Sequence, residues 1–232
     1  MALGRAFLSD LIKLKRSEAL DGASRVIEIG AQQLSDSFLE AGDLLDELYS
    51  AYGRSRRDLG RPSGTATLAD DAPSSREFWQ SIGLDYAAID YDGHRDSIAL
   101  DLNCDAVPDA LRGAFDLVVN TGTTEHVANQ GNAFQVVHDL TCKGGVMYHE
   151  VPAGGMWDHG LVSYNPKFFL LLEKQNDYKL LSMHERREND MTIRVAFRKR
   201  LNRVFVVPLD VLLEIMPTKY RQPWRTLRRI VG

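Results

Sequence analysis

The sequence has few cysteines, no long apolar run and no excess of basic charge. Its two cysteines, Cys104 and Cys142, are too few for a disulfide framework and lack the paired spacing of a zinc site, which favours a reducing, cytoplasmic compartment. Charged residues interrupt the amino-terminal apolar residues, so we expect an amphipathic helix over residues 1–20 and no signal peptide or transmembrane segment. The formal net charge of -4 argues against nucleic acid as a partner.

The composition predicts a single domain over residues 1–232 with two elaborations. A chain of 232 residues with 44% hydrophobic content can bury a sizeable core. Residues 53–75 are rich in glycine, serine, proline and charge and predict a long loop insertion. Residues 217–232 form a basic, aromatic tail without acidic residues. We expect this tail to be solvated or to contact a second copy in a homodimer, ahead of peripheral contact with an anionic membrane surface or a phosphorylated acceptor.

Residues 25–36, RVIEIGAQQLSD, predict the opening unit of an α/β sheet. The β-branched run before Gly30 is typical of a buried strand, and glycine permits a sharp turn there. Ser35 or Asp36 is then a suitable N-cap for a helix over about 36–52. Ligands of doubly wound sheets bind outside the carboxyl ends of the strands, so we expect Gly30 to face a ligand.

Acidic residues follow the next two expected strands. The strand over 86–90 ends at Asp90, whose carboxylate can accept hydrogen bonds from two vicinal ribose hydroxyls, with Asp92 as the alternative. A short strand over 97–100 is followed by Asp101, Leu102 and Asn103. A side chain at this third strand end is placed to pair with the exocyclic amine of an adenine.

The order of these parts resembles a known family. The series VIEIG, YAAID, ALDLN, FDLVVNTGTTEHV, NAFQVVHDLTCKGG and GVMYHEVP, over about residues 26–152, resembles the class I S-adenosylmethionine-dependent methyltransferases. The resemblance implies an α/β fold with a doubly wound, Rossmann-like, seven-stranded sheet that is mostly parallel and has an antiparallel last strand. It also implies S-adenosylmethionine as the cofactor.

The resemblance assigns roles to nine residues. Glu28, Gly30 and Gln32 would approach the methionine part, Asp90 the ribose, Asp101, Leu102 and Asn103 the adenine, and Asn120 and Thr121 the methionine or sulfonium. The family usually carries E-x-G-x-G-x-G, whereas this chain has Gln32 and Leu34 at the later glycine positions. Either a polar side chain replaces one close backbone approach, since this cofactor has no pyrophosphate, or the cofactor loop is eroded.

Three histidines are the candidates for a general base. Residues 147–160, MYHEVPAGGMWDHG, read as a loop that leaves the fifth strand near the same sheet edge and contains His149 and His159. Methyl transfer is an in-line displacement assisted by a base, for which these two rank ahead of His126. Each histidine alone is also compatible with a purely structural role. Side chains suited to bind zinc or magnesium also occur here, but no HExxH-like spacing does, so no metal is predicted. They are Glu125, His126, His149, Glu150, Asp158 and His159.

The carboxyl-terminal third favours an oxygen nucleophile. We expect a helix that begins at Asn165, a strand over 178–183 and a closing hairpin of 192–198 with 203–207. The stretch HGLVSYNPKFF more loosely resembles bacterial methyltransferases of polysaccharide and glycolipid biosynthesis. The sequence therefore predicts an O-methyltransferase for a small-molecule or glycan-precursor hydroxyl. The alternative is a non-catalytic binding or scaffold protein of this fold; a nicotinamide-dependent enzyme is disfavoured because no G-x-G-x-x-G follows the first strand.

Overall fold

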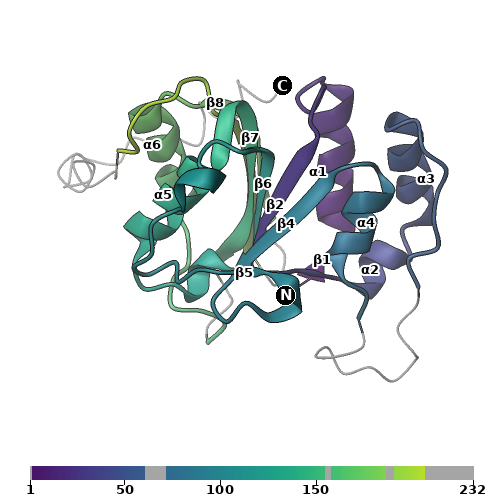
Figure 1. The fold of residues 1–232 in the computed structure, drawn as a ribbon, viewed down its shortest axis with the longest axis horizontal. Helices are drawn as coiled ribbons and strands as arrows, with labels where there is room; N and C mark the ends of the chain where they lie inside the picture. Colours follow the sequence, from purple (N-terminus) through teal and green to yellow (C-terminus); the bar gives the residue numbers. More distant parts are fainter. Residues whose placement is uncertain (1, 61–71, 155–157, 187–190, 207–232) are drawn as a thin grey trace.

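The fold is a seven-stranded sheet between two layers of helices (Figure 1). The computed structural model describes residues 2–60, 72–154, 158–186 and 191–206. The strand order is β5-β4-β2-β6-β7-β9-β8, and β9 alone runs antiparallel to its neighbours. The strands are β2 (Arg25–Ile29), β4 (Asp85–Asp90), β5 (Ile98–Ala99), β6 (Phe115–Thr121), β7 (Thr141–Gly154), β8 (Lys179–Arg186) and β9 (Met191–Arg198). This topology confirms the predicted fold class.

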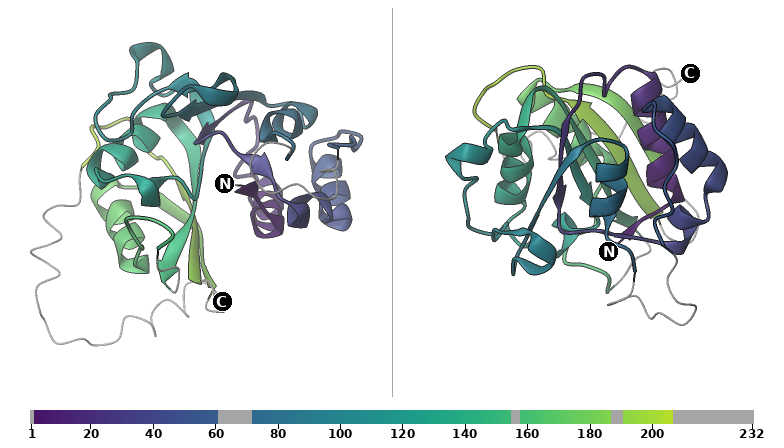
Figure 2. Two further views of the ribbon diagram at one scale, coloured as in Figure 1. Left: turned by 90° about the horizontal axis from the view of Figure 1, so that it is seen from below. Right: turned by 45° about the vertical axis from the view of Figure 1, so that its right-hand side comes forward.

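Helices cover both faces of the sheet, as Figure 2 shows. One layer contains α1 (Arg5–Arg16), α2 (Asp36–Leu39), α3 (Gly42–Ala51) and α4 (Ser75–Ser81), and the other contains α5 (Gln130–Leu140) and α6 (Pro166–Asn176). Successive strand side chains point to opposite faces. In β6, Leu117 and Val119 therefore pack with the first layer and Val118 with the second. Burial on both faces explains why the central strands are apolar runs.

Two short strands and three short 3-10 helices lie outside the main sheet and the α-helices in the described residues. A small parallel sheet pairs β1 (Ala2–Leu3) with β3 (Gln33–Leu34). Three 3-10 helices, η1 (His94–Asp96), η2 (Asp109–Leu111) and η3 (Thr124–His126), lie in the connections. The amphipathic helix expected within residues 1–20 is α1, which packs its apolar side against the first face of the sheet. No helix among the described residues is long and apolar enough to cross a lipid bilayer.

The prediction of one continuous helix over 36–52 is wrong, because the segment forms two helices, α2 and α3. Ser35 caps α2 by accepting a hydrogen bond from Phe38 N at 3.3 Å. The backbone leaves helical geometry at the fully buried Ala41, with φ -80° and ψ 55°, and α3 begins at Gly42. Glycine weakens a helix that would otherwise continue. After the break, α3 packs against α1, and Phe38 of α2 packs edge-to-face on Phe78 of α4.

The closing hairpin is also different from the prediction. β9 pairs with β8, which precedes it, and residues 203–206 form no strand. Asn176 at the end of α6 instead holds this segment by hydrogen bonds to the backbone N and O of Val206 at 2.8 and 3.1 Å. Residues 53–60 of the predicted loop have no regular structure, while 61–71 and the basic tail at 217–232 lie outside the described residues.

Candidate functional site

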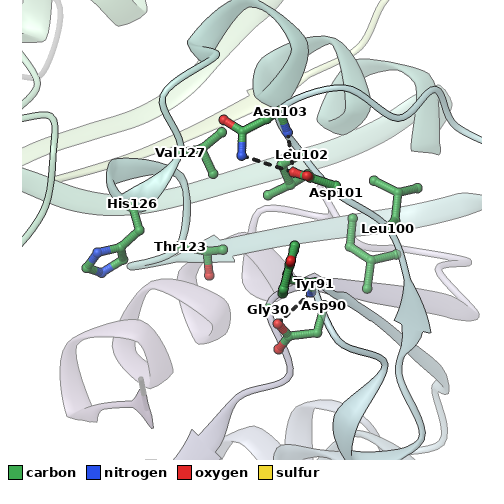
Figure 3. Close-up of a pocket in the computed structure, with 11 residues that line it drawn as sticks. Gly30, Asp90, Tyr91, Leu100, Asp101, Leu102, Asn103, Thr123, His126 and Val127 are labelled. Atoms are coloured by element: carbon green, nitrogen blue, oxygen red, sulfur yellow. Dashed lines mark hydrogen bonds between the residues drawn. The ribbon is translucent and has the colours of Figure 1, made fainter.

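A cavity of about 260 Å³ lies at the carboxyl ends of the central parallel strands (Figure 3). It is lined by Gly30, Ile89, Asp90, Tyr91, Leu100, Asp101, Leu102, Asn103, Thr123, His126 and Val127. Parallel strands that start at one edge of a sheet end together at the other, which is where doubly wound folds bind ligands. The cavity brings together five of the nine predicted cofactor residues: Gly30, Asp90, Asp101, Leu102 and Asn103.

Gly30 closes the end of β2 in a conformation that favours glycine. Its φ is +80°, and its N–H donates to Ile89 O at 2.8 Å. Thr123 Oγ1 donates to Ile29 O at 2.6 Å and lies over Gly30. A Cβ at position 30 would overlap Thr123 Oγ1 and approach Thr123 Cγ2 to 3.3 Å. Both the backbone geometry and the space therefore require glycine here.

We expect Gly30→Ala to destabilise the protein by more than about 1–2 kcal/mol, the usual cost of a left-handed conformation for a residue with a Cβ. Gly22→Ala is the matched control, because Gly22 has φ +72° and no atom within 4 Å of an added Cβ. The difference between the two free energies of unfolding, measured with urea, reports the contact with Thr123. Equal losses in both variants would show that Thr123 moves aside freely.

Asp90 presents its carboxylate at the end of β4. Oδ2 accepts a hydrogen bond from Ala31 N at 3.0 Å, and Oδ1 accepts one from Tyr91 N at 2.8 Å. Each carboxylate oxygen has a further lone pair for a ligand hydroxyl. Two backbone donors thus fix the orientation of this carboxylate at the cavity wall.

Asp101 and Asn103 form the wall that follows β5. Asp101 Oδ1 accepts hydrogen bonds from Asn103 N at 2.8 Å and Asn103 Nδ2 at 3.0 Å, and the backbone donor in particular lowers the pKa of Asp101. Asn103 Oδ1 accepts from Ala128 N and Asn129 N at 3.0 and 3.1 Å. These bonds tie the loop after β5 to the segment before α5, so this wall of the cavity is rigidly built.

Glu28 and Gln32 lie behind the cavity and do not line it. The fully buried carboxylate of Glu28 accepts hydrogen bonds from Trp79 Nε1 (2.7 Å), Ser75 Oγ (2.7 Å), Tyr86 OH (2.8 Å) and Gln32 N (3.0 Å). Burial raises the pKa of Glu28 and the four donors oppose that rise. Gln32 Nε2 donates to Gly30 O at 3.0 Å, while its buried Oε1 has no partner among the described residues.

His149 is part of the core, together with Asn120. The prediction that 147–160 leaves the sheet as a loop is wrong at its start, because β7 continues to Gly154 and includes His149. Asn120 Nδ2 lies 3.1 Å from His149 Nδ1 and 2.9 Å from Thr124 Oγ1. Burial lowers the pKa of His149 to about 3, so the ring is neutral at pH 7. Asn120, Thr121 and His149 are all buried and do not line the cavity.

Glu125, His126 and His159 form a polar cluster beside the cavity, which we call the Glu125 cluster. Glu125 Oε1 lies 3.5 Å from His159 Nε2 and 4.0 Å from His126 Nε2. The Glu125 side chain is 0% exposed, whereas those of His126 and His159 are 44% and 37% exposed. Burial raises the pKa of Glu125. The pKa of His126 is lowered, mainly by burial and to a smaller extent by the nearby His159.

Backbone contacts hold the two parts of the cluster together. Glu125 O accepts hydrogen bonds from Leu161 N at 2.8 Å and Val162 N at 3.0 Å. Gly160 lies so close that a Cβ there would be 2.9 Å from Glu125 Cγ. These contacts place His159, from the connection between β7 and α6, against η3, which carries Glu125 and His126.

Sequence reasoning missed several of these residues. Thr123, Tyr91 and the apolar lining at Ile89, Leu100 and Val127 carried no motif signal. The sequence presents Glu125 only as one of several possible metal ligands. The proximity of Glu125 to His159 depends on a turn 34 residues later in the chain, so no local pattern indicates it.

The strand order and the cavity at the strand ends define a doubly wound α/β fold with a cavity at the carboxyl ends of its parallel strands. No protein-family model and no curated protein matches the chain. Several solved structures are similar to this chain at low sequence identity.

The first is the Burkholderia thailandensis 1,6-didemethyltoxoflavin-N1-methyltransferase with bound 1,6-didemethyltoxoflavin and S-adenosylhomocysteine, at 12% identity and TM-score 0.49, covering 83% of this chain and 77% of that one. The second is the trans-methyltransferase CalH in complex with SAH, at 15% identity and TM-score 0.45, and the match covers 83% of this chain and 55% of that one. The third is a SAM-dependent methyltransferase from Archaeoglobus fulgidus, at 11% identity and TM-score 0.44, and the match covers 82% of this chain and 93% of that one. These similarities are too distant to assign a function, which has to come from the site itself.

Proposed function

We propose that this protein is an S-adenosylmethionine-dependent methyltransferase that methylates a hydroxyl of a small-molecule or glycan-type acceptor. The observation that supports it most is the convergence of Gly30, Asp90 and the 101–103 wall on one cavity. These residues come from the ends of three different strands or the loops that follow them, which is how this sheet topology binds a nucleoside.

The cavity suits the nucleoside part of the cofactor. The oriented carboxylate of Asp90 would accept hydrogen bonds from both ribose hydroxyls. The apolar side chains of Leu102 and Val127 would contact the faces of a flat base, and the polar groups of Asp101 and Asn103 lie at the same wall. When bound, the cofactor supplies an electrophilic methyl group on a sulfonium.

The acceptor would bind on the side of His126. Figure 3 shows His126 at one side of the cavity, with Thr123 between it and Asp90. A base in methyl transfer must reach the acceptor proton, which requires an accessible imidazole. We therefore assign proton acceptance to His126 or His159, both partly exposed, and not to the fully buried His149.

One observation favours the alternative of a non-catalytic scaffold. Glu28 has its carboxylate fully occupied by protein donors, and Thr123 and the Gln32 side chain lie against Gly30. The protein itself thus fills part of the space where the family's methionine moiety is expected. A scaffold protein would keep the fold and lose cofactor affinity.

Calorimetric titration with S-adenosylhomocysteine separates the two functions. We expect one equivalent to bind with a micromolar or lower Kd, and NADH to give no heat under the same conditions. Binding of S-adenosylhomocysteine supports the methyltransferase. A screen of hydroxylated acceptors in which S-adenosylmethionine is converted to S-adenosylhomocysteine supports it further. No heat at concentrations that detect micromolar binding would overturn the proposed function and leave the scaffold.

A further inference from the structure

The Glu125 cluster contains a buried carboxylate whose neighbours are two imidazoles, His159 Nε2 at 3.5 Å and His126 Nε2 at 4.0 Å from Oε1. Among the described residues, neither Oε1 nor Oε2 of Glu125 has a hydrogen-bond partner, although the side chain is 0% exposed. A buried ionised carboxylate is unfavourable unless it is paired or coordinates a metal. This contrasts with Glu28, another fully buried glutamate, whose carboxylate has four donors. Glu125 instead has two histidines beside it, and these three side chains together could hold a metal ion.

The atoms around this carboxylate are metal ligands in a compact arrangement. One carboxylate oxygen of Glu125 and one nitrogen each of His126 and His159 lie within 4.8 Å of one another. Zinc bound at 2.0–2.1 Å from each ligand in a tetrahedron needs ligand atoms about 3.4 Å apart. The Glu125 Oε1 to His159 Nε2 distance of 3.5 Å already meets this. The 4.0 Å to His126 Nε2 and the separation of up to 4.8 Å between the imidazole nitrogens close by rotation of the two partly exposed histidine side chains.

We propose that Glu125, His126 and His159 bind a divalent transition-metal ion, with zinc or cobalt as the best match to two imidazoles and one carboxylate. Three protein ligands leave a fourth position open, as in catalytic zinc sites. The partial exposure of both histidines leaves a path from solvent to that position. His126 also lines the cavity, so the open position lies next to the proposed nucleoside site.

The catalytic consequence rests on the proposed function, whereas metal binding itself does not. Two neutral imidazoles and one carboxylate leave a net charge of +1 on the metal site, which favours an anionic fourth ligand. An acceptor hydroxyl bound there would lose its proton to water, because a metal lowers the pKa of a bound hydroxyl. Its oxygen would then form a bond to the methyl carbon as the carbon–sulfur bond breaks, and the electron pair would stay on the neutral thioether. The metal would thus take over the activation assigned above to a free imidazole.

Zinc titration of the full chain, after removal of metal by a chelator and of any affinity tag, tests the site. We expect one equivalent of zinc to bind with a micromolar or lower Kd, and cobalt to give the visible absorption of a four-coordinate site. His126→Ala and His159→Ala should each weaken binding by at least about 10–100-fold, the loss typical of removing even an outer-shell partner. Both side chains are partly exposed, so these variants should keep the fold, which thermal melting in chelator checks.

His94→Ala is the matched control, since His94 is exposed on η1 and lies outside the cluster. It should bind zinc like the unaltered protein. The inference is overturned if the unaltered protein binds zinc no tighter than His126→Ala and His159→Ala, or if His94→Ala weakens binding equally. Titration of S-adenosylhomocysteine in the presence of chelator keeps the two proposals separate. Zinc binding without S-adenosylhomocysteine binding would overturn the methyltransferase proposal and support the metal site. S-adenosylhomocysteine binding without zinc binding would overturn the metal site and leave a free histidine as the base.

Discussion

Replacing Glu28 with alanine is expected to lower the free energy of unfolding by about 3–5 kcal/mol, among the largest effects of a single substitution in this protein. The carboxylate joins β2 to α4 through Trp79 and Ser75 and to β4 through Tyr86. Its loss leaves these buried donors without an acceptor, each at a cost of about 1–3 kcal/mol if it cannot find another partner. Urea unfolding followed by far-ultraviolet circular dichroism measures the change.

Tyr86→Phe is the graded comparison for this prediction. It removes one donor and keeps the ring, so a loss of only about 0.5–1.5 kcal/mol is expected. Glu28→Gln preserves volume but places an amide donor among four donors, and it should resemble the alanine variant more than Tyr86→Phe. A loss below about 1 kcal/mol for both Glu28 variants would show that the four hydrogen bonds are not formed together in solution.

Asp90→Ala is expected to weaken binding of S-adenosylhomocysteine by roughly 100-fold or more. A hydrogen bond to a charged group contributes about 1.5–3 kcal/mol, and the carboxylate of Asp90 would accept two from the ribose. Calorimetry on the variant and the unaltered protein under identical conditions measures the ratio of the two Kd values. The fold should tolerate the change, because Asp90 lies at a strand end and is only partly buried.

Asp92→Ala is the matched control for the ribose assignment. Asp92 is two residues away, carries the same charge, is exposed and does not line the cavity; its carboxylate accepts a hydrogen bond from His94 N at 2.9 Å. It should bind S-adenosylhomocysteine within about threefold of the unaltered protein, which corresponds to the effect of less than 1 kcal/mol expected for an exposed charge. A larger loss in Asp92→Ala than in Asp90→Ala would transfer the role to Asp92, and no loss in either would leave the ribose without a carboxylate partner.

The loop over 53–75 and the tail over 217–232 are the two elaborations of this domain. The homodimer, the cytoplasmic location, the role of the 53–75 loop and peripheral membrane contact through the 217–232 tail were all predicted from composition. In the described part of the loop, Arg56 Nη1 donates hydrogen bonds to Gly42 O and to Asp46 Oδ1, each at 3.2 Å. This arginine is therefore bound to α3 in the first helical layer. Sedimentation of the full chain with and without anionic vesicles tests the oligomer and the tail together.

The sequence by itself determined the order of strands and helices, because apolar β-branched runs, glycine turns and helix caps are local signals. The strand ends at Gly30, Asp90 and 101–103 could be placed for the same reason, since parallel strands bring their carboxyl ends to one edge. The sequence offers Ser35 or Asp36 as a helix cap and a helix start at Asn165, and in the structure Ser35 and Asn165 are the caps. The break at Ala41 and the extension of β7 past His149 depend on packing and pairing with β9, which local propensity does not contain.

Only the tertiary structure decided which polar residues face a ligand and which support the fold. Glu28 and Asp90 are both acids at or near strand ends, yet one is enclosed by donors from α4 and β4 and the other lines the cavity. His149 and His159 are ten residues apart and equally suggestive in sequence. Alternation along β7 turns His149 toward Phe134, Phe169 and Phe197, while a turn brings His159 to Glu125. Burial and partner are set by contacts between distant segments, and these contacts decide the chemistry of a side chain.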